Sequence, residues 1–199
     1  MWKLASREEI PIAPSGVNTF GLKVLKEVWE DPETGKIKTF WKYGLPDFVQ
    51  ILAVTTDDRI IVGQEFQPGV EKEFLHNTGG NIKEGESPEE AARRELFEET
   101  GYRAKRMIPL VPGGLLADSG RSSRLFWPCL AIGCTFDTTA EVDGEVSKIS
   151  LMTPGKWWEY LMKYLADEAQ APHGCSGSLK VTTLGYKYLG WLKLDPSIG

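Results

Sequence analysis

Cysteine and histidine are scarce in this sequence. Among 199 residues there are three cysteines and two histidines, His76 and His173. The cysteines are odd in number and form no CxxC pair, so neither a disulfide framework nor a zinc knuckle is expected. Two histidines are too few for a His-rich metal site, and they disfavour a Ser-His-Asp triad. Any chemistry in this chain is therefore expected to depend mainly on carboxylates.

Long apolar runs and an excess of positive charge are also lacking. Apolar stretches, such as residues 60–62 and 125–127, are far shorter than the ~20 residues of a membrane span, so no membrane insertion is expected. The net charge of −5 disfavours nonspecific binding of nucleic acid, because phosphates require clustered lysine and arginine. The first residues carry neither the apolar core of a secretory signal nor an Arg-rich transit pattern, and this predicts a cytoplasmic location.

The chain is expected to form one α/β domain with a small N-terminal extension. An N-terminal hairpin is predicted from strand patterns at 24–29 and 37–43, on either side of an Asp-Pro-Glu-Thr-Gly turn. Further strands are predicted at 48–55, 59–66, 124–133 and 146–152, of which the first two should be central. Pro128 favours an edge position or a bulge for the strand at 124–133.

Three segments show helical spacing. They cover Ser87 to Thr100, 154–169 and 179–192. Apolar residues at 157, 158, 161, 162 and 165 predict a core-facing stripe on the second helix. On the third helix, Leu184, Tyr188 and Trp191 share one side, which predicts its apolar face.

The first of these helices carries the acidic residues of interest. Ser87, Pro88 and Glu90 form a helix start with a capping box, and Gly101 is a natural stop. An advance of 100° per residue places three carboxylates on one face of this helix, those of Glu95, Glu98 and Glu99. Ala92 and Leu96 form the adjoining apolar stripe, which can pack against a sheet.

These carboxylates repel one another, so something must compensate. Arg94, four residues before Glu98, offsets part of the repulsion, and a solvated acidic face with ordinary ion pairs is one interpretation. The other is binding of a divalent cation, because Mg²⁺ takes oxygen ligands and often bridges carboxylates to substrate phosphates. The helix alone leaves both interpretations open.

The full pattern around the helix resembles that of a known family. Residues 79–102, GGNIKEGESPEEAARRELFEETGY, contain Gly80, Glu86, Arg94-Glu95, Glu98-Glu99 and Gly101 at the spacing G-x5-E-x7-R-E-U-x-E-E-x-G-U, in which U is apolar or aromatic. This is the signature of the Nudix hydrolases. The resemblance implies an α/β/α sandwich around a mixed sheet, with the Nudix domain at 45–199 and the antiparallel β extension at 1–44.

The resemblance also implies roles for individual residues. Glu95, Glu98 and Glu99 would be ligands of Mg²⁺ or Mn²⁺, together with the main-chain carbonyl of Gly79. Glu98 would take part in catalysis, and Arg94 would orient the glutamates rather than touch the substrate. Glu86 would brace the loop before the helix. No further cofactor is implied.

The N-terminal hairpin, the phrase VGQEFQPGV and a late acidic loop resemble the ADP-ribose and nucleotide-sugar pyrophosphatase branch. In that branch a glutamate on the late loop activates water. Here Glu145 matches best and Asp143 second, while a solvated acidic loop is an alternative. Two positions depart from the branch. Glu65-Phe66-Gln67 replaces a phrase that ends in arginine, and Ser119-Gly120 replaces a Pro-Gly pair.

The expected function is Mg²⁺-dependent hydrolysis of ADP-ribose or a nucleotide sugar to a nucleoside monophosphate and a sugar phosphate. Hydrolysis of a dinucleoside polyphosphate or a coenzyme is an alternative, as is a Nudix module that senses a nucleotide without cleaving it. The N-terminal extension is too small for its own core. In the pyrophosphatases that this chain resembles, such a segment pairs with a second subunit, and the resemblance therefore implies a homodimer. The aromatic residues Phe40, Trp41 and Phe66 are expected in strand packing rather than in the site.

Overall fold

The computed structural model describes residues 1–12, 21–67, 71–140, 146–166 and 176–192. These residues form two compact units. The first contains Met1–Asp47 and Leu115–Phe126, and the second contains Phe48–Gly114 and Trp127–Gly199. None of the helices in the described ranges is long and apolar enough to cross a membrane.

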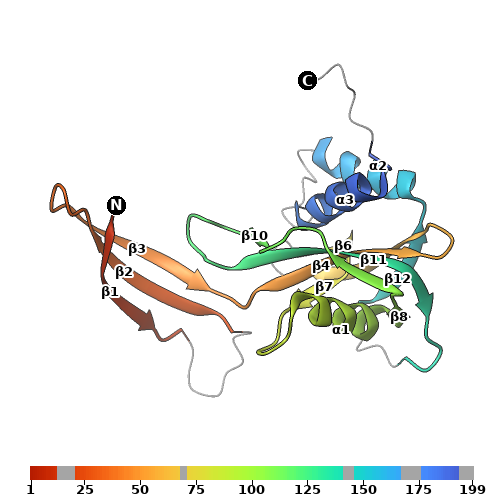
Figure 1. The fold of residues 1–199 in the computed structure, drawn as a ribbon, viewed down its shortest axis with the longest axis horizontal. Coiled ribbons are helices and arrows are strands. Elements are labelled where there is room, and N and C mark those ends of the chain that lie inside the picture. The colour runs from red at the N-terminus through yellow and green to blue at the C-terminus, as the bar shows by residue number, and fades with distance from the viewer. Residues whose placement is uncertain (13–20, 68–70, 141–145, 167–175, 193–199) are drawn as a thin grey trace. The chain divides into compact units, whose positions relative to one another are not determined.

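The first unit contains a three-stranded antiparallel sheet (Figure 1). Its strands are β1 (Lys3–Ile10), β2 (Lys23–Glu30) and β3 (Ile37–Gly44), in the order β1-β2-β3. The hairpin expected at 24–43 is confirmed as β2 and β3. The sequence did not predict β1, because nearly all of its side chains are exposed and it therefore has no alternating apolar pattern.

Residues 115–126 belong to the first unit because they bind the end of β3. The Tyr43 N–H donates to the Arg121 carbonyl at 3.0 Å, and the Tyr43 hydroxyl donates to Asp118 at 2.9 Å. Arg124 Nε donates to the carbonyl of Pro46 at 2.6 Å. The unit therefore consists of the N-terminal sheet and one segment from later in the chain.

The main sheet runs in the order β10-β11-β4-β5-β12 and, apart from β10 and the first two residues of β11, belongs to the second unit. Along this path the strands are β10 (Leu115–Leu116), β11 (Leu125–Phe136), β4 (Phe48–Thr55), β5 (Ile60–Gln67) and β12 (Lys148–Met152). Four short strands flank the path: β6 (Lys72–His76) pairs with β5, β7 (Gly79–Asn81) with β4, and β8 (Tyr102–Arg103) and β9 (Arg106–Pro109) with β11. The strands predicted at 48–55 and 59–66 are confirmed, as is their central position.

The edge position expected for the strand around Pro128 is wrong. β11 lies between β4 on one side and β9 and β10 on the other. On that second side β10 pairs at Leu125 and Phe126 and β9 pairs from Cys129 onward, so Pro128 falls where the neighbouring strand changes. A residue without an N–H is tolerated there because no ladder bond is required from it. Its carbonyl still accepts from the Leu110 N–H at 2.8 Å.

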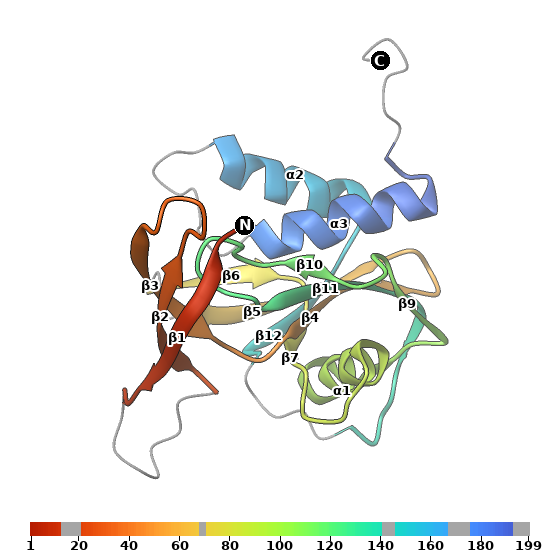
Figure 2. The same ribbon diagram turned by 60° about the vertical axis from the view of Figure 1, so that its left-hand side comes forward.

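Helices cover both faces of the main sheet in the second unit (Figures 1 and 2). α1 (Pro88–Thr100) lies on one face, and α2 (Pro154–Ala166) and α3 (Ser176–Leu189) lie on the other. The three predicted helices are thus present, in the sandwich arrangement expected from the sequence. The core under α1 contains Val49, Ile51 and Leu96, all fully buried.

The face of α3 that the sequence predicted to be apolar is not the buried one. Tyr188 is 54% exposed, and Leu184 and Trp191 are half-buried. The buried residues of α3 are Ser178, Val181, Thr182, Gly185 and Tyr186. Small and hydroxyl-bearing residues therefore face the sheet, because α3 lies close to β4 and forms hydrogen bonds there.

Two cysteines lie in the interior of β11. Cys129 and Cys134 are both free and buried. Burial raises the pKa of each thiol to about 12, so both are protonated at neutral pH. These two cysteines are packing residues, and Cys175 lies outside the described residues.

Candidate active site

α1 begins and ends through local interactions that the sequence specifies. The Ser87 hydroxyl accepts from the Glu90 N–H at 3.2 Å, and the Glu90 carboxylate accepts from the Ser87 N–H at 2.8 Å. This is the predicted capping box. At the other end Gly101 adopts a left-handed conformation with φ of 73° and donates to the Phe97 carbonyl at 2.8 Å. The helix register, and with it the direction of each glutamate, is therefore set at both ends.

The apolar side of α1 fixes the helix on the sheet. Ala91, Ala92 and Leu96 are fully buried and pack in the same core as Val49 and Ile51 of β4. Burial of this side leaves the acidic residues at the margin of the sheet, beside β7. The sequence placed the carboxylates on this side of the helix, next to the apolar stripe.

Arg94 holds the acidic residues of this region together. Its guanidinium binds both carboxylate oxygens of Glu86, at 2.7 and 2.8 Å. The Nη1 atom also donates to Glu95 at 2.7 Å and to Glu98 at 3.1 Å. The Nη2 atom donates to the main-chain carbonyl of Asn81 at 3.0 Å. One arginine therefore links the loop before α1, two glutamates of α1 and the end of β7.

The carboxylates around Arg94 are not electrostatically equivalent. Hydrogen bonds from Arg94 lower the pKa of Glu86 to about 2. Burial raises the pKa of Glu95 above its usual value, and the nearby Arg94 offsets this only in part. Glu86 is thus a firmly ionised partner of Arg94, whereas Glu95 gains from any additional positive charge placed beside it.

Two glycines allow β7 to approach its neighbours closely. A Cβ atom at Gly80 would overlap the Glu95 carboxylate, and one at Gly79 would overlap the Val49 carbonyl oxygen. Gly79 and Gly80 pair with Gln50 and Val49 of β4. The first two residues of β7 are thus held between β4 and the Glu95 side chain. The main chain of Gly79 is therefore next to the residue, Gly80, that contacts Glu95.

The other two glutamates of the α1 face differ in exposure. The Glu98 side chain is 41% exposed, whereas Glu99 is buried. In the part of the chain that the structure describes, no three Asp, Glu, His or Cys side chains form a complete ligand cluster. The donor chemistry nevertheless fits Mg²⁺ or Mn²⁺, because the side chains are all carboxylates and Mg²⁺ usually retains several waters and needs few protein ligands. The raised pKa of Glu95 fits a neighbouring cation as well.

Comparison with known protein families identifies the family in which this arrangement occurs. The NUDIX domain family matches residues 46–169, which include the whole of α1 and the loop before it. The chain belongs to the Nudix family.

Several Nudix relatives resemble this chain over part of its length. The ADP-ribose pyrophosphatase of Bacillus subtilis (strain 168) is 37% identical over 109 residues, which are 54% of this chain and 58% of that protein. The ADP-sugar pyrophosphatase of Mus musculus is 35% identical over 95 residues, or 42% and 43% of the two chains. The methanol dehydrogenase activator of Bacillus methanolicus is 34% identical over 66 residues, or 33% and 36%. The match thus spans about half or less of each curated relative.

A solved structure resembles nearly the whole chain. The crystal structure of an ADP compounds hydrolase superposes with a TM-score of 0.73 and covers 96% of this chain and 95% of that one, at 20% sequence identity. This likeness confirms the expected Nudix-type α/β fold, including the antiparallel N-terminal sheet. At this identity it bears on the fold alone.

The residue expected to activate water in this Nudix domain cannot be placed. Glu145, Asp143 and Glu141 lie outside the described residues. The structure resumes at Val146, which is buried and close enough to β5 that a Cβ at Gly63 would be 2.9 Å from it. The assignment of Glu145 therefore stays a prediction.

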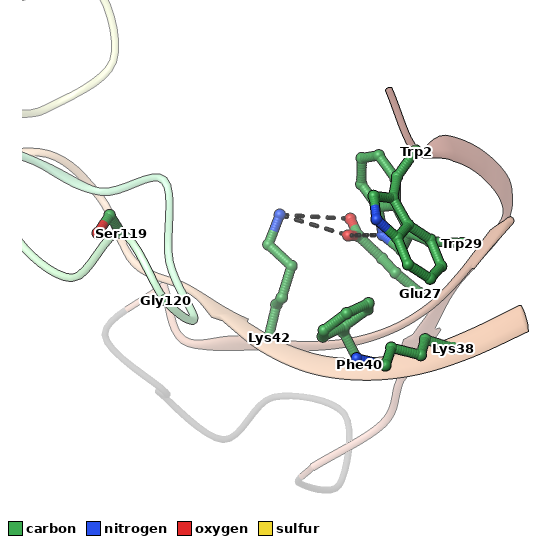
Figure 3. A pocket seen from close by; sticks show the side chains of 8 residues that line it. All are labelled: Trp2, Glu27, Trp29, Lys38, Phe40, Lys42, Ser119 and Gly120. Carbon is green, nitrogen blue, oxygen red and sulfur yellow. Dashed lines mark hydrogen bonds and ion pairs between the residues drawn. The ribbon is translucent and has the colours of Figure 1, made fainter. Parts of the chain in front are cut away.

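The structure contains a pocket in the first unit that the sequence did not predict. It measures about 330 Å³ and is lined by Trp2, Glu27, Trp29, Lys38, Phe40, Lys42, Ser119 and Gly120 (Figure 3). Phe40 was expected in strand packing but is 42% exposed at this pocket, and Trp41 and Phe66 are exposed as well. The only available signal was the alternation of aromatic and charged residues along β2 and β3.

A fully buried carboxylate forms part of this pocket. Glu27 accepts a hydrogen bond from Trp29 Nε1 at 2.9 Å, and its carboxylate lies 3.4 Å from Lys42 Nζ (Figure 3). It also accepts a hydrogen bond from Arg7 Nε at 2.7 Å. Burial by itself would raise the pKa of Glu27, but the hydrogen bonds from Trp29 and Arg7 and the charge of Lys42 lower it overall. Glu27 is thus an ionised, fully partnered group that ties β1, β2 and β3 together.

Proposed function

We propose that this chain hydrolyses the diphosphate linkage of ADP-ribose or a nucleotide sugar, giving a nucleoside monophosphate and a sugar phosphate. The observation that carries the proposal is the group of carboxylates gathered by Arg94 beside Gly80, within a Nudix domain. Two of its relatives are an ADP-ribose pyrophosphatase and an ADP-sugar pyrophosphatase, which supports this substrate class.

The proposal assigns Glu95, Glu98, Glu99 and the main-chain carbonyl of Gly79 to the binding of Mg²⁺, with Mn²⁺ as a substitute. When bound, such a cation neutralises the diphosphate and acidifies water near it. Arg94 orients Glu95 and Glu98 and balances their charge, while Glu86 keeps Arg94 in place. Glu98, the most exposed of the glutamates held by Arg94, is the one best able to reach toward the diphosphate.

Substrate identity can be tested by a screen. Purified protein and Mg²⁺ would be incubated with ADP-ribose, several nucleotide sugars, a dinucleoside polyphosphate and a coenzyme, and the products identified by mass. We expect AMP and ribose 5-phosphate from ADP-ribose, or the equivalent pair from a nucleotide sugar. Exclusive cleavage of the dinucleoside polyphosphate or the coenzyme would place the chain in another branch. Tight nucleotide binding without any cleavage would indicate a sensing module.

The cation ligands can be tested by charge removal. Glu98→Gln and Glu99→Gln keep the shape of the side chain but remove its charge, so activity should fall by orders of magnitude while the fold is retained. Circular dichroism and thermal unfolding would verify the fold of each variant. Near-normal turnover in both variants would contradict the assignment.

We also propose that Glu145 accepts the proton of the attacking water. A base is required because water must lose a proton as it attacks, and a positioned general base contributes about 10²–10⁴-fold. Glu145→Gln should therefore reduce kcat much more than Asp143→Asn, with metal affinity nearly unchanged. Wild-type kcat in Glu145→Gln, at saturating Mg²⁺ and substrate, would move the base to Glu98, Glu99 or Glu141.

A homodimer is proposed as the assembly. The proposal rests on the first unit, which leaves large apolar side chains exposed, among them Trp2, Ile37 and Trp41 at 37%, 67% and 55%. A sheet this small gains stability when such a surface is covered.

A further inference from the structure

A buried polar network lies on the face of the main sheet opposite α1. Asn77, which connects β6 to β7, is fully buried, and so are Ser178 and Thr182 of α3. Trp157 of α2 is also fully buried beside them. Burial of so many polar groups is costly unless they are hydrogen-bonded to one another.

The hydrogen bonds of this network converge on Asn77. Thr182 Oγ1 accepts from Trp157 Nε1 at 2.9 Å and donates to Asn77 Oδ1 at 3.1 Å. Ser178 Oγ accepts from the Asn77 N–H at 3.0 Å. Gln50 Nε2 of β4 donates both to Ser178 Oγ and to the Asn77 carbonyl, each at 3.1 Å. The side-chain oxygen, the N–H and the carbonyl of Asn77 are thus all held.

α3 is held at close range on the strand that carries Gln50. A Cβ atom at Gly177 would overlap the Gln50 side chain, and one at Gly185 would overlap Leu52. These two glycines are about two helical turns apart, so the helix approaches β4 closely along this whole stretch. The hydroxyls of Ser178 and Thr182, which lie between the glycines, have little freedom to move away from Asn77.

Asn77 is joined directly to the residues that flank the carboxylate cluster. The Thr78 carbonyl accepts from the Ile51 N–H at 2.8 Å, and β7 follows at once. Gly80 of β7 lies against the Glu95 carboxylate, and the Asn81 carbonyl accepts from Arg94. A shift of Asn77 would therefore be passed along the next four residues of the backbone to the Glu95 and Arg94 side chains.

The stability of the fold alone does not require that these buried side chains be polar. Apolar residues of similar volume would bury the same area without the cost of desolvating four polar side chains, and replacing both partners of a hydrogen bond by apolar groups of the same shape can be nearly neutral or stabilising. A hydrogen-bonded network restricts orientation, because it holds a group at one distance and angle. The β7 strand requires such a fixed orientation if it lies beside a cation site.

We propose that Ser178 and Thr182 are positioning residues which, through Asn77, hold the Gly79–Gly80 segment in the register that the cation-binding carboxylates require. This inference rests on the proposed function insofar as that function assigns Glu95 and the Gly79 carbonyl to cation binding. It gives the face formed by α2 and α3 a role in a site that lies on the other face of the sheet.

The test compares two substitutions at one position. Thr182→Val keeps the shape of the side chain but removes the hydroxyl that links Trp157 to Asn77, whereas Thr182→Ser retains the hydroxyl. Binding of Mn²⁺ would be measured by isothermal titration calorimetry without any substrate. We expect Mn²⁺ to bind about 3- to 30-fold more weakly to Thr182→Val and within about twofold of wild type to Thr182→Ser. In the hydrolysis assay Thr182→Val should lower kcat more than it raises KM.

Val181→Ala is the matched control for lost stability. Val181 is a fully buried neighbour of Thr182 on α3 and has no polar atom in its side chain. We expect Val181→Ala to unfold at a lower temperature and to bind Mn²⁺ as wild type does. The inference is overturned if Thr182→Val binds Mn²⁺ normally, or if Val181→Ala weakens binding to the same extent. If wild type binds Mn²⁺ but cleaves none of the nucleotides, the proposed function fails, while the binding comparison still decides the inference.

Discussion

Arg94 is the residue on which the organisation of the candidate site depends. It holds Glu86, Glu95 and Glu98, and a planar guanidinium with five N–H donors is required for that many partners. A lysine at the same position has a single charged nitrogen and could not hold both oxygens of Glu86 while it also reached α1. Geometry therefore matters at this position as much as charge.

We predict that Arg94→Lys lowers kcat and Mn²⁺ affinity by about 10–100-fold, the range observed when residues that orient metal ligands are replaced. Steady-state kinetics and calorimetry would measure the two effects. Arg93→Lys is the control on the same helix, because Arg93 is an exposed partner of Glu89 and such surface pairs contribute little. Equal losses of kcat and Mn²⁺ affinity in the two variants would show that the guanidinium geometry of Arg94 has no special role.

The lowered pKa of Glu86 predicts how the free energy of unfolding depends on pH. Its pKa is about 2 in the folded chain, below the usual carboxyl value, so its contribution is complete at pH values above the unfolded pKa and is lost as the pH falls toward 2. Glu86→Gln should therefore be less stable than wild type at pH 7 by roughly 1–2 kcal/mol, with the gap closing between pH 4.5 and 2. Urea unfolding at a series of pH values would measure it. A gap that stays constant with pH would contradict the prediction.

At the scale of elements, α1 depends on its first turn. The Ser87 hydroxyl is the acceptor for the Glu90 N–H, so Ser87→Ala removes half of the capping box. We predict a loss of about 1 kcal/mol in the free energy of unfolding. Ser87→Asp, which keeps an acceptor at the N-cap, should recover most of it. Denaturant titration of the three proteins would decide, and an Ala variant as stable as wild type would argue against the cap.

Elements whose ends are set by neighbours in sequence were predictable. Ser87 and Gly101 define α1 without reference to the rest of the chain, and the β-branched residues of β4 and β5 mark two central strands. β1 was not predictable because its side chains are exposed. The buried side of α3 was mispredicted because hydroxyls at Ser178 and Thr182 pair with Asn77, about 100 residues earlier, and hydropathy contains no information on such a pair.

The same distinction applies to the site. The spacing of the glutamates and Arg94 on α1 follows from sequence, since helical geometry is local. The close approach of Gly80 to the Glu95 carboxylate depends on where β7 lies, which only the fold determines. The network around Asn77 and the buried Glu27 also join distant segments, so sequence spacing does not reveal them.

At the scale of the whole molecule, the first unit should determine assembly. We predict that wild type is a dimer at micromolar concentration and that a truncation lacking residues 1–44 is monomeric and inactive. The truncation also removes Tyr43, the hydrogen-bond partner of Asp118 and of the Arg121 carbonyl. Light scattering coupled to size exclusion would measure mass. A monomeric wild type, or a truncation that remains dimeric, would contradict the prediction.

The two thiols inside β11 provide a chemical probe for opening of the main sheet. Cys129 and Cys134 are 0% and 1% exposed, and their raised pKa leaves almost no thiolate at neutral pH. In a Cys175→Ser background, a disulfide reagent such as Ellman's should react only when the middle of the main sheet opens, so the labelling rate counts opening events. Saturation with Mg²⁺ and a nucleotide should slow that rate by a factor of one plus the ratio of ligand concentration to Kd, because the ligands stabilise the closed state by RT times the natural logarithm of that factor. The colour change would then report ligand binding by a protein that carries no attached dye.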